Sequence, residues 1–421
     1  MIRRALPGVL GVLLVAGCRA AAPPQPFVGE PGLSRGLAFA DSLVQGAVGK
    51  LTAGAVLVVS KNGRVVHERA FGVAQLKSQN CFTNGCAVSV GSPMKLSTMF
   101  DLASVTKVMA TTFAMMLLVD QGKIDVDAPV YTYLPDFRGA HLDSITVKNL
   151  LQHSAGLVQW QPLYYQASNA AQTYTAIRNM PLQWGVGEGR HYSDFSFMLL
   201  GDIVEHVSGR RLDAFVDQNL YRPLGLRHTT FNPKAKGFAE FAATEDGNIY
   251  EHHMVYDSTF AYKYRGDPKS WNGWRDHVLI GEVDDGNSFY ANGGVAGHAG
   301  LFSTGEDLHV LMSVLLNKGT YDGHVYIRPG TIDRFFTLDK YVNYLGWQYP
   351  SALPAGSFSH TGFTGTYVLG VPSENLSIVL LTNRQQMGTD PKGFFPALGP
   401  LQAAVSKAIV DGAGADASHP K

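Results

Sequence analysis

The sequence predicts an α+β fold, in which helices flank one antiparallel sheet and a mainly helical lobe is inserted into the chain. Two apolar runs, 54–60 and 64–70, surround Asn62-Gly63, a strong signal for a β-hairpin. Two further strand patterns, 365–371 and 377–382, stand near the C-terminus with a turn between them. Because the long helical patterns lie between the two pairs of strands, the middle of the chain is expected to form the lobe.

The N-terminus has the pattern of a secretion signal. Arg3 and Arg4 precede an apolar run, 6–16, that is too short to span a bilayer. The run ends in a sequence that resembles a bacterial lipobox, 15–18, so we expect a signal peptide over 1–17 and a lipid on Cys18. The alternative is an ordinary signal peptide with a chance cysteine. Lipidation would place a periplasm-facing lipoprotein on the bacterial cell envelope, with residues 18–32 as a tether.

Composition excludes some partners. The formal net charge is +0 and only 16% of residues are charged, without a basic tract, so nucleic acid is not an expected partner. Nothing in the sequence indicates an oligomeric state. Cys81 and Cys86 lie in a polar segment that reads as a surface loop, and in an exported protein they are expected to form a structural disulfide.

The remainder of the chain, 33–411, is expected to be one domain. Its α/β part covers about 33–100 and 295–411, and the helical lobe about 101–294. Helical patterns occupy 33–51, 145–157, 195–207, 212–220, 305–316 and 395–410, whereas 233–292 is irregular. Residues 412–421 are expected to be a disordered tail.

The stretch 100–118, FDLASVTKVMATTFAMMLL, holds the strongest chemical signal. Ser104 and Lys107 lie one turn apart at the start of an apolar helix. A partly desolvated lysine has a lowered pKa, and a neutral amine in reach of a serine hydroxyl acts as a general base. Ser104 could instead be a helix N-cap. Ser92 and Lys95 have the same spacing, but Pro93 and the missing apolar run indicate a loop.

A serine nucleophile needs a proton carrier and an oxyanion donor. Tyrosine followed two residues later by Asp or Asn occurs at Tyr192, Tyr290 and Tyr341. We favour Tyr192, with Asp194, because a glycine-rich turn precedes it and a helix follows. The third element is His360-Thr361-Gly362, which opens a strand pattern whose backbone N–H groups could reach the serine.

In this order, Ser104-x-x-Lys107, Tyr192-x-Asp194 and His360-Thr361-Gly362 resemble the serine β-lactamase and penicillin-binding-protein superfamily, class C type. The stretches LLQHSAGL, GEVDDGNS and GVAGHAGLFST are similar to those of penicillin-binding protein 4B-like D-alanyl-D-alanine carboxypeptidases and related esterases. The resemblance implies a β-lactamase/transpeptidase-like fold. It also implies attack by Ser104, with Lys107 as base, Tyr192 as proton relay, and an oxyanion hole from the N–H groups of Ser104 and Phe363.

The resemblance implies substrate contacts at Asp194, His360, Thr361 and Gly362, with two departures. Asp194 stands where the family commonly has asparagine, and His360 where it commonly has lysine. Without a permanent cation at 360, a β-lactam carboxylate is held less well, so weak or no β-lactamase activity is expected. The expected function is a D,D-peptidase or esterase-like hydrolase acting on a small molecule or a peptidoglycan-derived peptide. A non-catalytic sensor that binds peptidoglycan or β-lactams in the same pocket is the alternative.

No cofactor is expected. His153, His298 and the pair Asp284-Asp285 could be read as a metal site, but no helical His-x-x-x-His pairing supports it.

Overall fold

We analysed a computed structural model of the chain, which describes residues 31–76, 91–139 and 141–417. The signal peptide, Cys18, most of the tether and both Cys81 and Cys86 lie outside the described residues. The predicted anchor and disulfide therefore stay predictions.

The described fold is α+β, as predicted, and is built on a six-stranded antiparallel sheet of order β11-β12-β13-β1-β2-β3. The predicted hairpin is β1 (Gly54–Lys61) and β2 (Arg64–Gln75), and its turn residues Asn62 and Gly63 both have positive φ. β12 (Tyr367–Val371) and β13 (Leu376–Thr382) form the second predicted pair. β11 (Phe358–Thr361) is the edge strand beyond them. Ser92 lies on the short edge strand β3 (Ser92–Pro93), so the loop predicted there is wrong.

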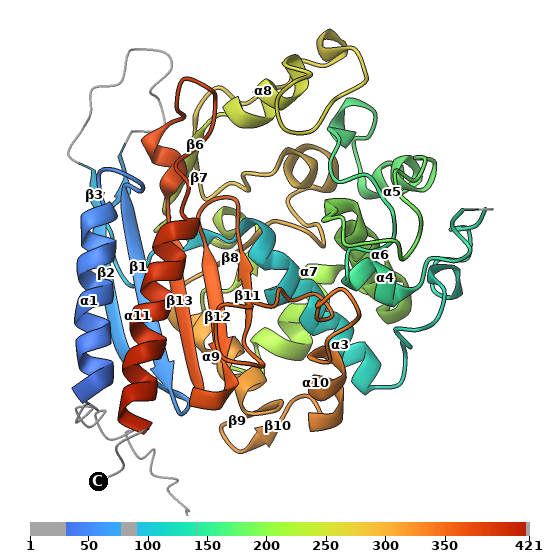
Figure 1. The fold of residues 1–421 in the computed structure, drawn as a ribbon. Coiled ribbons are helices and arrows are strands. Elements are labelled where there is room, and N and C mark those ends of the chain that lie inside the picture. The colour runs from blue at the N-terminus through green and yellow to red at the C-terminus, as the bar shows by residue number, and fades with distance from the viewer. Residues whose placement is uncertain (1–30, 77–90, 140, 418–421) are drawn as a thin grey trace, which may run out of the picture.

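The central strands are buried on both faces because helices cover each side (Figure 1). Val56 and Val58 of β1 pack with α9 (Gly305–Leu316), whereas Leu57 and Val59 pack with α1 (Pro31–Ala47) and α11 (Gly399–Ala417). This alternation follows from the two-residue period of a strand. β1 and β13 therefore read as continuous apolar runs.

α1 and α11 lie side by side on one face of the sheet (Figure 1). A Cβ added at Gly36 would lie 2.4 Å from the carbonyl oxygen of Ala408, and one at Gly412 would lie 2.7 Å from that of Gly32. Glycine lets the two backbones approach closely at both ends of the contact. The prediction of a disordered tail from 412 is wrong for 412–417, because Gly412 and the buried Ala413 continue α11 along α1.

We expect Gly36→Ala to lower the free energy of unfolding by about 1–3 kcal/mol, since its methyl group would overlap the Ala408 carbonyl. Gly46→Ala is the matched control in the same helix, because nothing lies within 4 Å of an added Cβ there. That control should raise stability by up to about 1 kcal/mol through helix propensity. Urea unfolding measures both, and equal effects of the two variants would contradict the close helix contact.

The segment after β4 (Phe100–Asp101) runs through the middle of the helical lobe. It comprises a 3₁₀ turn (Ala103–Val105), a π-helical turn (Lys107–Thr112) and α3 (Phe113–Asp120). Met115 and Leu118 are buried as well as Met116 and Leu117, so burial is not confined to one face of the helix. Ala103–Asp120 is long and apolar enough to cross a membrane, yet 83% of it is buried within the protein, as in a core helix.

The rest of the lobe surrounds this segment. It contains α4 (Val147–Leu151), α5 (Ala170–Arg178), α6 (Asp194–Ser208), α7 (Leu212–Val216), α8 (Ile249–Tyr256), α10 (Pro329–Phe335), β5 (Thr230–Phe231), β6 (Ala243–Asp246), β7 (Val278–Ile280) and β8 (Leu301–Ser303). A small hairpin, β9 (Thr320–Tyr321) and β10 (His324–Val325), follows α9. The region predicted to be irregular, 233–292, therefore includes α8 and the β6–β7 pair.

Candidate active site

Ser104 is held at the start of the core segment by strained local geometry. Ala103 has φ 45, a left-handed conformation that non-glycine residues rarely adopt. Its backbone N–H donates to Asp101 Oδ1 at 2.8 Å, and the N–H of Leu102 donates to the carbonyl of Leu301 at 2.9 Å. These bonds fix the turn and leave Ser104 partly exposed at the head of the helix, as the sequence predicts.

Lys107 lies directly below the serine and is fully buried. Its Nζ donates to Ser104 Oγ at 2.9 Å, to Asp194 Oδ1 at 2.7 Å and to the carbonyl oxygen of His298 at 3.1 Å. Asp194 and the His298 carbonyl can only accept, so two N–H bonds always point at them. The third position, which faces Ser104, is an N–H in the ammonium form and a lone pair in the neutral amine. Only this third position can change from a hydrogen-bond donor to an acceptor.

The expectation of a neutral Lys107 is wrong for the resting protein. Burial opposes the charge on Lys107, but the Asp194 carboxylate and, less strongly, Tyr192 more than offset it and hold the pKa above its ordinary value. Lys107 and Asp194 therefore form a buried ion pair. The prediction of a neutral amine rested on burial, and the Asp194 carboxylate reverses the direction of the shift.

Tyr192 completes the cluster. Lys107 Nζ lies 5.0 Å from the centroid of its ring, and Tyr192 lines the same two cavities as Ser104. Burial raises the pKa of the Tyr192 phenol above its ordinary value, so the phenol is neutral near pH 7. The ring packs against His153 at an interplanar angle of 30°, with the centroids 4.4 Å apart. His153 Nδ1 accepts the backbone N–H of Ser193 at 3.0 Å, which fixes the strand-like segment before α6. Tyr290 and Tyr341 contact other groups, namely Asn248 and the Gly187 carbonyl.

The end of β11 lies beside the serine turn. Thr364 Oγ1 donates to the carbonyl of Asp101 at 2.7 Å, and Thr366 Oγ1 to that of Leu102 at 2.9 Å. A Cβ at Gly362 would lie 2.4 Å from the same Leu102 carbonyl, so only glycine permits this approach. The turn thus brings Gly362 and Phe363 next to Ser104, as the oxyanion-hole prediction requires.

His360 does not reach a cavity. It is buried, its Nδ1 donates to the carbonyl oxygen of Thr361 at 2.9 Å, and burial lowers its pKa to about 3. The predicted substrate contact at His360 is therefore wrong in this arrangement, because the ring packs beneath β11 beside Tyr192. The site has no cation at this position at any physiological pH.

Two cavities meet at Ser104, Tyr192, Tyr262 and Phe363. We call the first, of about 420 Å³, the carboxyl-lined cavity: it is lined by Asp194, Glu245, Glu251, Asp284 and Asp285 together with His298 and the aromatic side chains of Trp160 and Tyr250. We call the second, of about 610 Å³, the arginine-lined cavity: it is lined by Arg190, Arg384, Gln348, Thr361, Gly362 and Gln402. Thr361 and Gly362 therefore lie where the sequence predicts, at the mouth of a pocket that includes the serine.

Burial decides the charges of the carboxyl-lined cavity. It raises the pKa of Asp284 to about 6 and that of Glu251 to about 8. Burial also works against the charge on Asp285, but His298, whose Nε2 lies 2.9 Å from Asp285 Oδ1, lowers the pKa below its ordinary value. Near pH 7 this cavity therefore contains both charged and protonated carboxyl groups.

A sequence model of the beta-lactamase family matches residues 40–395 of the chain. The chain belongs to the beta-lactamase family. This beta-lactamase-family protein is 35% identical over 373 residues to a Bacillus subtilis (strain 168) protein named N-acetylmuramyl-L-alanine amidase, covering 82% of this chain and 80% of that protein. It is 34% identical over 359 residues to an Escherichia coli (strain K12) protein named "Putative D-alanyl-D-alanine carboxypeptidase", covering 78% and 77% respectively.

Among solved structures, this beta-lactamase-family protein is similar to a penicillin-binding protein homolog from Caulobacter crescentus. The TM-score is 0.64 at 20% sequence identity, over 90% of this chain and 97% of that one. The likeness confirms the predicted β-lactamase/transpeptidase-like fold. With the family match it makes the protein a serine hydrolase of this superfamily.

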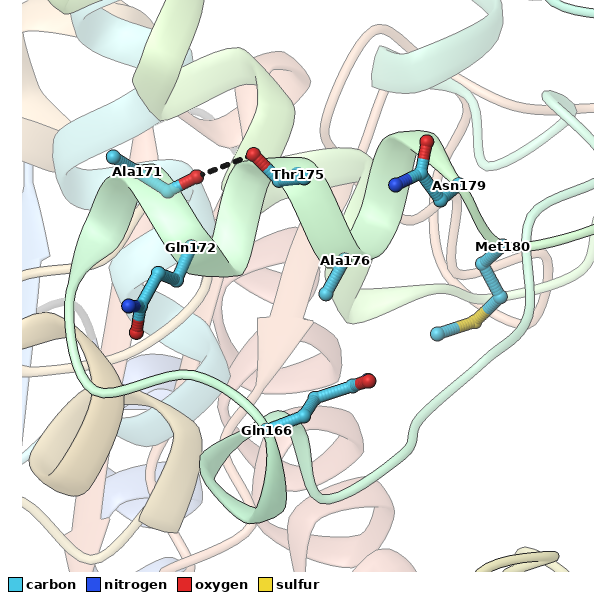
Figure 2. A pocket seen from close by; sticks show the side chains of 7 residues that line it. All are labelled: Gln166, Ala171, Gln172, Thr175, Ala176, Asn179 and Met180. Carbon is cyan, nitrogen blue, oxygen red and sulfur yellow. Dashed lines mark hydrogen bonds between the residues drawn. The ribbon is translucent and has the colours of Figure 1, made fainter.

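Other features of this beta-lactamase-family protein do not form a site. Across the described ranges, no group of three or more His, Cys, Asp or Glu side chains is arranged to hold a metal ion. His153 and His298 instead position Tyr192 and Asp285. A cavity of about 570 Å³ along α5 is shown in Figure 2, and its lining is Gln166, Ala171, Gln172, Thr175, Ala176, Asn179 and Met180. None of these side chains is titratable or a strong nucleophile, so this cavity offers no reactive group.

Sequence reasoning missed three supporting residues of the site. His153 lies in the quoted stretch LLQHSAGL but was considered only as a possible metal ligand. The only sequence feature that marked Asp101 and Arg190 was their position, within three residues of Ser104 and Tyr192 respectively. Their positions depend on contacts between distant segments, which no local pattern reports.

Proposed function

We propose that this protein hydrolyses a small peptide or ester, with peptidoglycan-derived D-alanyl-D-alanine peptides as the first candidates, through an acyl-enzyme on Ser104. One observation carries the proposal: Lys107 Nζ lies 2.9 Å from Ser104 Oγ, and Tyr192 lies beside both, with its ring centroid 5.0 Å from Lys107 Nζ and its side chain in the same cavity as Ser104. The names of the two relatives, an amidase and a carboxypeptidase, support amide bonds in the cell wall as the substrate class.

In the proposed mechanism Ser104 Oγ bonds to the substrate carbonyl while its proton passes to the lone pair of neutral Lys107. The reactive form is the minor state in which Lys107 has lost its extra proton. The N–H groups of Ser104 and Phe363 stabilise the oxyanion. Tyr192 relays the proton to the leaving group, and a water then hydrolyses the ester by the same route in reverse.

We propose weak or no β-lactamase activity. The neutral, buried His360 supplies no charge for the β-lactam carboxylate, and Asp194 places a carboxylate at the edge of the pocket. A β-lactam with a charged carboxylate is therefore expected to bind less tightly here than at a site with a lysine at 360.

We also propose that the enzyme works at the bacterial cell envelope, as a periplasm-facing lipoprotein anchored through Cys18. The apolar run before Cys18 and its lipobox-like end support this. Cells expressing a Cys18→Ala variant are expected to release the protein from the membrane fraction. A variant that stays in the membrane fraction would contradict the lipid anchor.

The experiment that tests the function is intact-mass analysis after incubation with D-Ala-D-Ala peptides, short-chain esters and β-lactams in parallel. We expect a transient acyl adduct with the peptide or the ester, and slow or absent adduct formation with β-lactams. Folded protein that is acylated by none of the three classes, and by no fluorophosphonate, would overturn the proposal.

A further inference from the structure

The two cavities beside Ser104 differ in the ionisable side chains that line them. Five carboxyl side chains and no lysine or arginine line the carboxyl-lined cavity, whereas two arginines and no carboxyl side chain line the arginine-lined cavity, counting the described residues. Both cavities share Ser104, Tyr192, Tyr262 and Phe363, so a substrate that reaches the serine can extend into either. An anionic group is repelled by one side and attracted by the other.

The two arginines of the arginine-lined cavity differ in what they already bind. Arg384 donates from Nε to the carbonyl of Phe363 at 2.8 Å and from Nη1 to that of Pro396 at 3.0 Å, so it holds the turn after β11 in place. Arg190 has no hydrogen-bond or ion-pair partner within the described part of the chain. Its Cζ lies 5.6 Å from the centroid of the Tyr192 ring, and Asp339 acts on it only through space. A guanidinium carries five donors in a planar fork that suits a carboxylate.

We propose that Arg190 binds a carboxylate of the substrate in the arginine-lined cavity and so sets the enzyme's preference for anionic peptides. This inference rests on the function proposed above and names the substrate class of the same site. Arg190 lies in the same cavity as Thr361, whose hydroxyl can donate to the same carboxylate. A free C-terminal carboxylate next to the scissile amide, as in a D-Ala-D-Ala peptide, fits this arrangement.

The test compares acetyl-D-Ala-D-Ala with its C-terminal carboxamide, which differs only in charge. Each compound is used to protect Ser104 against labelling by a neutral fluorophosphonate, and any hydrolysis is measured as kcat/KM. We expect the wild type to bind the carboxylate at least about 10-fold more tightly than the carboxamide, in line with a charge-assisted hydrogen bond. Arg190→Gln should lose that preference without weakening carboxamide binding, and Arg190→Lys should keep part of it.

Arg227→Gln is the matched control, because Arg227 is exposed and lines neither cavity. It should keep the full preference for the carboxylate. A wild type that does not distinguish the two compounds, or an Arg190→Gln variant that weakens both equally, would overturn the inference. Either result leaves the proposed function standing as long as Ser104 is still labelled by the fluorophosphonate, so the two failures can be told apart.

Discussion

Replacing Ser104 with alanine is expected to lower kcat/KM by roughly 10⁴- to 10⁶-fold, since the variant has no atom with which to form the acyl-enzyme. The change removes one oxygen that accepts from Lys107, and Lys107 keeps its bonds to Asp194 and the His298 carbonyl. The fold should therefore be preserved. Intact-mass analysis should show no adduct with peptide, ester or fluorophosphonate.

Ser92→Ala is the matched control for this experiment. Ser92 and Lys95 repeat the spacing of Ser104 and Lys107, but Ser92 is exposed on the edge strand β3, and Lys95 pairs with Glu240. The control should keep wild-type activity and form the same adduct. An adduct that persists in Ser104→Ala would show that another residue is the nucleophile.

Asp194→Asn is expected to move the rising limb of the pH profile of kcat/KM to lower pH by about 1–3 units. In the wild type the carboxylate holds the Lys107 pKa above its ordinary value, so the neutral base is scarce at pH 7 and becomes commoner as the pH rises. With asparagine, burial is the dominant influence on Lys107 and favours the neutral amine. Activity at pH 7 should rise roughly 10-fold or more, because each unit of pKa changes the neutral fraction tenfold in this range.

Asp202→Asn serves as the control, because Asp202 lies on the same helix, α6, and no hydrogen bond or ion pair joins it to Lys107 in the described part of the chain. The rising limb of its pH profile of kcat/KM should stay at the wild-type pH. An unmoved limb in Asp194→Asn would mean that Lys107 is not the base. Loss of activity at every pH would mean instead that Asp194 itself accepts the serine proton through Lys107.

The loop that contains Gly297 and His298 helps to orient the Lys107 amine, because the His298 carbonyl accepts one of its hydrogen bonds. Thr111 Oγ1 donates to the carbonyl of Gly297 at 2.6 Å, and a Cβ at Gly297 would lie 2.0 Å from the carbonyl of Phe197. The glycine-rich loop therefore packs tightly between the core helix and α6. This packing aims the His298 carbonyl at Lys107, which keeps one N–H of the amine occupied and leaves the third position for Ser104.

Local sequence determined much of this protein. The Asn62-Gly63 turn can close a hairpin because both residues tolerate positive φ, and the apolar runs of β1 and β13 could only be buried strands. The Ser104–Lys107 spacing placed a hydroxyl and an amine on one side of a helical turn, since neighbours three apart share a face. The glycine-rich turn before Tyr192 and the helix after it then distinguished this residue among three tyrosines.

Tertiary structure decided what those groups do. Lys107 is charged because α6 brings Asp194 within 2.7 Å, and His360 is neutral because β11 buries its ring. The end of α11 is ordered because Gly412 meets Gly32 across the helix pair. A pKa and a packing contact both depend on which distant segments lie within a few ångströms, and on how much water they exclude. Spacing along the chain fixes neither quantity. The reactive residues could therefore be named from the sequence. Their protonation states could not, and neither could the two cavities, one lined by carboxyl groups and the other by arginines.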